Sequence, residues 1–340
     1  MTDMTGNSPK DTGSANISNN EAAMIRFGRN IKWSALAPPL VFIAMLLAVG
    51  VLNVNYLGPL GISIATATAA PIMFLALGQS MVLNIGSIDL SNAAIALLGA
   101  LLIALALPPL GFGSFVLILL MVTAIGAING AVVSYAQVPS FALTLGTLAI
   151  LQTAALVVSG ADTIYVSSNR ELISVLYQKQ ILYAPLTFWF GILAAFILWA
   201  LLRYTVLGQN MTAMGKNELG ATLSAVPTRM VRIITYALSG FMGGLAGLSI
   251  VAQAGSASAS GLGSDLLLPG IAAALIGGTS ISGGQTNPLN VVFGGLTVAF
   301  VPIAIQAMKL GAQAQSLVYG IFIILVVALT TVRSRDTVIK

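Results

Sequence analysis

The sequence predicts an all-α polytopic membrane protein with about ten transmembrane helices and both termini in the cytoplasm. Composition is the first of three observations that lead to this class. Of the 340 residues, 57% are apolar and only 7% are charged, and the mean hydropathy is +0.98. In a soluble globular protein, roughly a quarter of all residues are charged. This chain therefore cannot cover a water-facing surface, which excludes a soluble enzyme, a DNA-binding protein and a disordered linker.

Long apolar runs are the second observation. A bilayer crossing needs about 20 mostly apolar residues, and a helix satisfies its backbone hydrogen bonds within lipid. The runs lack the alternation that is typical of an outer-membrane barrel. We predict transmembrane helices at 34–52, 63–84, 89–107, 114–135, 139–158, 184–202, 229–251, 266–281, 288–308 and 314–332. The eighth of these runs is short and rich in glycine.

The basic residues are the third observation, because they gather in the loops that face the cytoplasm. With the N-terminus inside, only Arg170, Lys179 and Lys309 of the 14 basic residues fall in outer segments. Both termini and the loop 203–228 are then cytoplasmic. We predict that residues 1–32 are a disordered cytoplasmic tail, 33–333 a transmembrane domain and 334–340 a second cytoplasmic tail. We do not expect nucleic acid as a partner, because the basic residues are scattered over the loops.

The absence of two residue types narrows the chemistry. The sequence contains no Cys and no His, so thiolate and imidazole groups cannot serve as nucleophiles, bases or metal ligands. The remaining carboxylates rarely fall inside apolar runs. We expect no catalytic residues, no metal site and no cofactor.

A first polar island, Gly86–Asn92, interrupts the apolar sequence. Asp89 has long apolar runs on both sides, and a carboxylate in mid-bilayer costs roughly 2.5–3.5 kcal/mol on insertion scales. Asp89 and Ser91 either line a transport pathway or cap the start of the third helix. Asn84 and Asn129 are further pathway candidates, with hydrogen bonds between helices as the alternative.

A second island is the inner loop 203–228, whose small and polar residues indicate a short amphipathic helix and a turn. It either docks into a groove of a soluble partner or is a solvated connector. Gly215-Lys216 resembles the end of a phosphate-binding loop, but Asn210 and Asn217 stand where that pattern needs Gly and Ser or Thr. This chain is therefore not expected to hydrolyse ATP. The candidate docking residues are Gly208, Ala213, Gly215, Asn217, Glu218 and Ala221.

A third island is the segment 277–284, in which two glycine pairs enclose hydroxyl side chains. Thr279, Ser280 and Ser282 are pathway candidates, because unwound backbone within a membrane is tolerated where it is buried or lines a cavity. The alternative is a plain tight turn. Other glycines recur at a spacing of four, which lets helix backbones approach closely and predicts packing contacts. They are Gly126 and Gly130, Gly240 and Gly244, and Gly243 and Gly247.

The three islands follow one another as Ile-Asp-Leu-Ser, Ala-x-Gly-x-Asn and Gly-Gly-Thr-Ser-Ile-Ser-Gly-Gly. In this order they resemble the motifs of the permeases of ribose/xylose/arabinose-type ABC importers. This family includes the autoinducer-2 permeases, and the resemblance covers about residues 56–332. The resemblance implies a permease dimer, made of two copies or a copy and a paralogue, in the bacterial inner membrane. It also implies a cytoplasmic ATP-binding subunit that meets the inner loop, and a periplasmic sugar-binding protein.

The chain departs from the family pattern in three places. The family usually has Ala-Ala-Arg-x-x-Gly-Ile where Gly220–Val226 stands, an acidic residue near Leu267–Gly270, and Gly-Gly where this chain has Gly86-Ser87. The resemblance to this class of permease holds despite these departures. They affect what can be inferred about the substrate and about the contacts with the ATP-binding subunit.

The function that we predict is import of a sugar or sugar-like polyol through a passive pathway, driven by ATP hydrolysis in the partner subunit. The alternative is an ion-coupled secondary transporter of a small neutral solute. Such transporters often place several ionisable groups near mid-membrane, where this chain has Asp89 and little else.

Overall fold

The computed structural model describes residues 33–260 and 265–330. The chain divides into two compact units, 1–37 and 38–340, and the fold described below is that of the second. The predicted tails 1–32 and 334–340 lie outside the described residues. The long helices are α2 (Trp33–Leu52), α3 (Pro59–Asn84), α4 (Asn92–Leu110), α5 (Gly113–Ala136), α6 (Ser140–Ser159), α8 (Leu186–Tyr204), α11 (Thr228–Ala254), α14 (Pro288–Ala307) and α15 (Ala314–Thr330).

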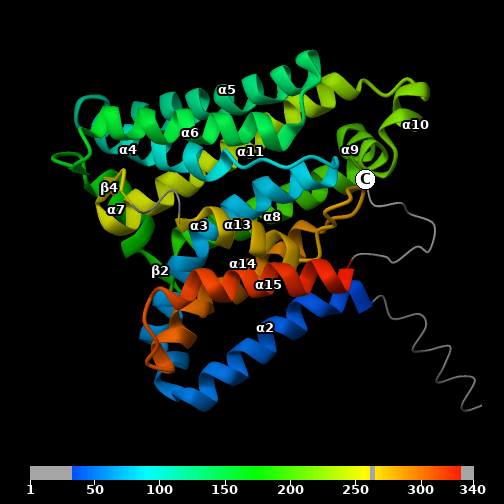
Figure 1. The fold of residues 1–340 in the computed structure, drawn as a ribbon. Coiled ribbons are helices and arrows are strands. Elements are labelled where there is room, and N and C mark those ends of the chain that lie inside the picture. The colour runs from blue at the N-terminus through cyan, green and yellow to red at the C-terminus, as the bar shows by residue number, and fades with distance from the viewer. Residues whose placement is uncertain (1–32, 261–264, 331–340) are drawn as a thin grey trace, which may run out of the picture. The chain divides into compact units, whose positions relative to one another are not determined.

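Shorter elements connect these helices, and most of them gather at the two ends of the bundle, whereas α13 lies between α3 and α14 (Figure 1). At one end, β1 pairs with β4 and β2 pairs with β3, both antiparallel. At the other end, α9 and α10 join α8 to α11. The short elements are η1 (Val54–Leu57), β1 (Thr163–Tyr165), α7 (Glu171–Gln178), β2 (Gln180–Ile181), β3 (Ala184–Pro185), α9 (Val206–Lys216), α10 (Glu218–Leu223), β4 (Ser256–Ser258) and α13 (Leu267–Ile276).

Seven helices in the described part of the chain are long and apolar enough to cross a membrane, namely α3, α4, α5, α6, α8, α11 and α14. This confirms the all-α polytopic class. The eighth predicted run, 266–281, is not a full-length helix, because α13 covers only Leu267–Ile276. At 1.5 Å per residue α13 is about 15 Å long, half of the hydrocarbon core. The helix stops where Gly278 adopts a φ of 83°, a conformation that favours glycine.

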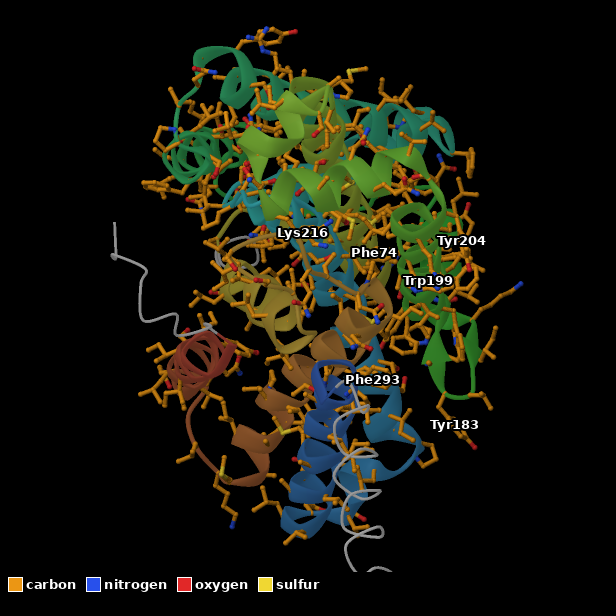
Figure 2. All side chains as sticks on the ribbon, turned by 90° about the vertical axis from the view of Figure 1, so that its right-hand side faces the viewer. Phe74, Tyr183, Trp199, Tyr204, Lys216 and Phe293 are labelled. Atoms are coloured by element: carbon orange, nitrogen blue, oxygen red, sulfur yellow. The ribbon has the colours of Figure 1, made fainter. Side chains whose placement is uncertain are left out.

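Helices α3 and α11 form the centre of this unit. Helix α11 packs against α3, α4 and α5, and α3 packs against α8, α13 and α14. Figure 2 shows Phe74 of α3 inside the bundle, whereas Trp199 and Tyr204 lie along the outer edge formed by α8. The buried side chains of α3 are mostly apolar, so the hydrophobic core surrounds this helix.

Glycine contacts bring the central helices together as the sequence predicts. A Cβ atom added to Gly240 of α11 would lie 2.5 Å from the backbone oxygen of Val122 in α5. A Cβ atom on Gly247 would lie 2.5 Å from the backbone oxygen of Ala96 in α4. A Cβ atom on Gly126 would collide with the backbone of Tyr236. These glycines therefore set the close packing of α4, α5 and α11.

Candidate functional site

The three polar islands meet at the end of the bundle where α3 ends. The backbone N–H of Gly284 donates a hydrogen bond to the backbone oxygen of Asn84, over 2.8 Å. A Cβ atom on Gly215 would collide with that same oxygen, and one on Gly283 would lie 2.9 Å from the backbone nitrogen of Gly86. We call this contact of Asn84, Gly86, Gly215, Gly283 and Gly284 the glycine junction.

The turn after α13 owes its shape to glycine and to its own hydroxyl groups. Gly278, Gly283 and Gly284 have φ angles of 83°, 89° and 72°, which a side chain would strain. The hydroxyls of Thr279 and Thr286 are 2.8 Å apart, and those of Ser280 and Ser282 are also 2.8 Å apart. The segment is thus a tight turn that packs against α9 and against the end of α3.

Asp89 lies in a buried polar network that links four elements. Its side chain is 0% exposed. Its Oδ1 atom accepts hydrogen bonds from the backbone N–H and the hydroxyl of Ser91, over 2.9 and 2.6 Å. Its Oδ2 atom accepts one from the hydroxyl of Ser239, over 2.8 Å. Ser91 is the N-cap residue of α4, but its own side chain makes no capping hydrogen bond. Asp89 instead accepts from backbone N–H groups at the start of α4, which favours the capping interpretation of Asp89 over that of Ser91.

Asn129 extends the same network from α5 to α6. Its Nδ2 atom donates to the hydroxyl of Ser91 over 2.9 Å, and its Oδ1 atom accepts from the hydroxyl of Thr147 over 2.9 Å. These hydrogen bonds between helices match the alternative that the sequence left open for Asn129. The structure therefore brings Asp89, Ser91 and Asn129 together, and it places Asn84 apart from them in the glycine junction.

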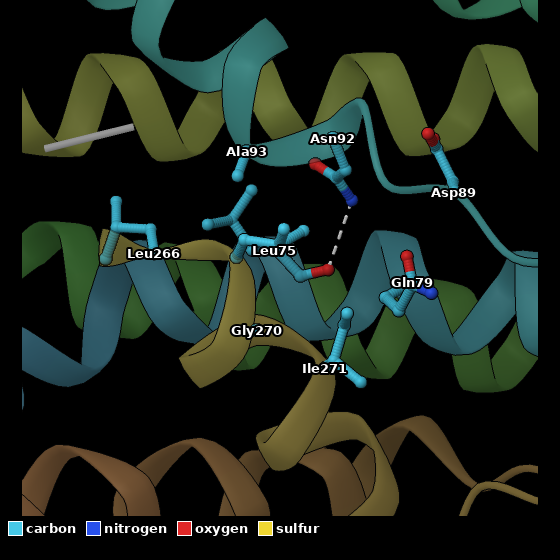
Figure 3. Close-up of a pocket in the computed structure, with 9 residues that line it drawn as sticks. Leu75, Gln79, Asp89, Asn92, Ala93, Leu266, Gly270 and Ile271 are labelled. Atoms are coloured by element: carbon cyan, nitrogen blue, oxygen red, sulfur yellow. Dashed lines mark hydrogen bonds between the residues drawn. The ribbon is translucent and has the colours of Figure 1, made fainter. Parts of the chain in front are cut away.

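A small pocket lies beside this network (Figure 3), between α3, the start of α4 and the start of α13. Its volume is about 10 Å³, which is room for roughly one water molecule. Two of its lining side chains carry buried polar atoms without a hydrogen-bond partner, the Nε2 atom of Gln79 and the Oδ1 atom of Asn92. Neither residue was predicted to be part of a site. Gln79 is an amide inside an apolar run, and Asn92 is the last residue of the polar island Gly86–Asn92. In this conformation the pocket is too small for a monosaccharide.

The inner loop presents a different surface from the one that the sequence indicates. Gly208 and Ala221 are buried, Gly215 is in the glycine junction, and Ala213, Asn217 and Glu218 are exposed. The largest exposed apolar side chains of α10 are Leu219 and Leu223, at 71% and 81%. Neither leucine was predicted to be a docking residue, because an isolated leucine in a loop gives no signal of exposure.

Capping and an ion pair fix the shape of this loop. The hydroxyl of Thr205 accepts a hydrogen bond from the backbone of Gly208, and the side chain of Asn217 accepts one from the backbone of Gly220. Both are N-cap contacts that begin α9 and α10. Glu218 forms an ion pair with Arg232 of α11. The apolar face formed by Leu219 and Leu223 is thereby held at a fixed place on the end of the bundle.

Residues 61–327 match the family model described as the branched-chain amino acid transport system / permease component. The chain belongs to this family. Among the similar proteins is the D-allose transport system permease protein of Escherichia coli (strain K12), 31% identical over 77% of this chain and 81% of that protein. Another is the ribose import permease protein of Haemophilus influenzae, 29% identical over 74% of this chain and 79% of that protein. No solved structure matches.

A third relative extends the likeness over more of the permease. The autoinducer 2 import system permease protein of Photorhabdus luminescens is 29% identical over 88% of this chain and 90% of that protein. The family and the seven apolar helices together make this chain a multi-pass permease of the bacterial inner membrane. It is a transport subunit and not an enzyme, since a separate ATP-binding subunit hydrolyses ATP in such importers. A periplasmic binding protein is the other partner that the family implies.

Proposed function

We propose that this permease imports a monosaccharide, or a sugar-like polyol, that a periplasmic binding protein delivers. The observation that supports this substrate class is the likeness to permeases named for ribose and D-allose, at 29% and 31% identity over about three quarters of the chain. Among the described residues, the buried polar side chains are hydroxyls and amides together with one carboxylate, Asp89. Such groups suit a neutral solute that forms hydrogen bonds.

The proposal includes ten crossings with both termini in the cytoplasm. Helix α13 belongs to the eighth of these crossings, and the glycine junction is then at the inner face. The distribution of basic residues supports this topology, because Lys216, Arg229 and Arg232 lie at the same end as the junction.

Asn84, Ser280 and Ser282 are at the inner end of the proposed pathway, next to the junction. Asn84 has a buried Oδ1 atom with no hydrogen-bond partner, and Ser282 is exposed. Asp89, Ser91, Asn129 and Thr279 are the deeper members of the proposed lining, and each of them is buried in this conformation. A solute would reach them only after helices move apart, which the ATP cycle of the partner would drive.

The inner loop is the proposed contact with the ATP-binding subunit. Leu219 and Leu223 supply exposed apolar area on α10, and Ala213, Asn217 and Glu218 are the other exposed members of the proposed contact. Gly215 of the same loop is part of the glycine junction. A displacement of α9 would therefore be transmitted directly to the end of α3 and to the turn after α13, which α9 contacts there. A second permease copy or a paralogue completes the proposed transporter.

The test is reconstitution of the permease with its ATP-binding subunit and binding protein in proteoliposomes. Labelled D-ribose and D-allose are offered outside, with ATP enclosed on the side of the ATP-binding subunit. Uptake that needs ATP and the binding protein is the expected result. Uptake by the permease alone, driven by a proton or sodium gradient, would instead establish the secondary-transporter alternative.

A further inference from the structure

An apolar pocket of about 260 Å³ lies at the other end of the bundle from the glycine junction. Helices α3 and α11 form part of its wall, and the first turns of α5 and α8 and the short helix α7 form the rest. None of its nine lining residues is charged, and Thr187 is the one that carries a hydroxyl. The lining residues are Phe74, Phe112, Phe115, Leu172, Leu176, Thr187, Phe190, Leu245 and Leu248.

The rim of this pocket is continuous with the lipid-facing surface of the permease. Phe112 is 68% exposed, Phe190 is 47% exposed and Leu172 is 38% exposed. Along α8, Leu193 and Ile197 continue the exposed apolar face that Phe190 begins, at 51% and 54%. In a spanning helix such a face contacts lipid, so the pocket opens sideways toward the bilayer.

The depth of the pocket matches one leaflet. Phe190 is in the first turns of α8, whereas Leu245 lies about 14 Å along α11 from the end at Ala254, at 1.5 Å per residue. Half of the hydrocarbon core of a bilayer is about 15 Å thick. The deepest α11 residue of the lining is therefore about as far from the helix end as the hydrocarbon layer of one leaflet is thick, which matches the length of an acyl chain in a bilayer.

We propose that this pocket binds one acyl chain of a phospholipid from the leaflet at the α7 end, the outer leaflet in the proposed topology. Burial of an acyl chain against this uncharged aromatic and aliphatic lining is favourable, by roughly 25 cal/mol per Å² of apolar surface removed from water. A sugar would find one hydroxyl there and would leave its own hydroxyl groups unpaired. The bound chain fills the space between α5 and α8 and supports the packing of α5 on α11 and of α8 on α3.

The experiment uses the purified permease in a steroid-based detergent, because an alkyl detergent would itself supply a chain. Dioleoyl phosphatidylglycerol is added, and dihexanoyl phosphatidylglycerol serves as a control with the same headgroup and short chains. Calorimetry measures the melting temperature, and native mass spectrometry measures retained lipid. We expect the dioleoyl lipid to raise the melting temperature by roughly 2–5 °C and the dihexanoyl lipid to leave it unchanged.

Two variants that fill the pocket and one matched control locate the effect. Leu248→Trp and Leu176→Phe add volume inside the pocket, and we expect both to lose the response to the dioleoyl lipid. Leu193→Trp adds the same indole on the lipid-facing side of α8, outside the pocket, and keeps the response. If Leu248→Trp fails to fold, the smaller Leu176→Phe change decides the result.

Three results would overturn the proposal. The first is an equal lipid response in the filling variants and the wild type, and the second is an equal response to both lipids. The third is displacement of the retained lipid by millimolar D-ribose, which would assign the pocket to the solute. None of these measurements needs ATP or uptake, so failure of the proposed transport function leaves them interpretable.

Discussion

At the residue scale, single glycines decide whether backbones can meet. Gly215 is the clearest case, because its α-carbon faces the backbone oxygen of Asn84 and the backbone nitrogen of Gly284 at once. These are main-chain atoms, so they cannot swing aside as the end of a flexible side chain can. Any larger residue must push α9 away from the end of α3.

We therefore predict that Gly215→Ala lowers ATP-driven uptake at least tenfold while the protein still inserts into the membrane. The matched control is Gly146→Ala in α6, where an added Cβ atom meets nothing within 4 Å. Uptake in proteoliposomes and the amount of permease in the membrane are both measured. Wild-type uptake by Gly215→Ala would show that the glycine junction has no part in transport.

Asp89 is the second residue with a specific expectation. Its two oxygens accept three hydrogen bonds in a site with 0% exposure. Asp89→Asn replaces one acceptor with a donor that faces a hydroxyl or an N–H group, and an unsatisfied buried group costs about 1–3 kcal/mol. We predict a lower melting temperature for the purified permease.

The matched control for Asp89→Asn is Asp162→Asn, which changes an exposed carboxylate in the loop before β1. Uptake normalised to folded protein separates the two roles of Asp89. Unchanged normalised uptake assigns it to capping, and reduced normalised uptake assigns it to the pathway. An unchanged melting temperature would contradict the structural role of the network.

At the scale of elements, the short helices determine which surface is available to a partner. The sequence predicted one amphipathic helix and a turn in the loop 203–228, and the structure has two short helices there, α9 and α10. The periodicity of the loop could not show which side chains remain exposed, because that depends on how α10 sits on α11. The ion pair of Glu218 with Arg232 fixes this placement.

We predict that Leu219→Asp and Leu223→Asp each reduce co-purification of the ATP-binding subunit at least tenfold, because a buried unpaired carboxylate would replace apolar contact. Thr222→Asp is the matched control, since it adds the same charge to an exposed position of the same helix. Pull-down from detergent extracts measures the complex. Equal losses for all three variants would attribute the effect to charge rather than to the leucines.

At the scale of the whole molecule, the proposed topology has a direct chemical test. The chain has no Cys, so a single introduced Cys is the only thiol that a reagent can label. We predict that a membrane-impermeant maleimide labels Lys179→Cys from the outside of intact spheroplasts. Lys216→Cys should react only after the membrane is opened.

The two positions control for each other, since both replace an exposed lysine at the end of a short helix. Labelling of Lys216→Cys in intact spheroplasts would invert the proposed orientation. Labelling of both positions from outside would instead change the number of crossings between α7 and α9.

The apolar runs by themselves determined the class of this protein and nearly all of its long helices, because a bilayer demands continuous helices of about 20 apolar residues. Glycine spacing likewise predicted close backbone packing at Gly126, Gly240 and Gly247, and the structure supplied the partner helices. Run length failed at 266–281, where ten residues are helical and the rest form a turn. Only the tertiary structure brought Asn84, Gly215 and Gly284 together, since these residues are far apart in sequence and meet through backbone atoms. Main-chain contacts and exposure depend on how helices pack, and no periodicity of side chains encodes them.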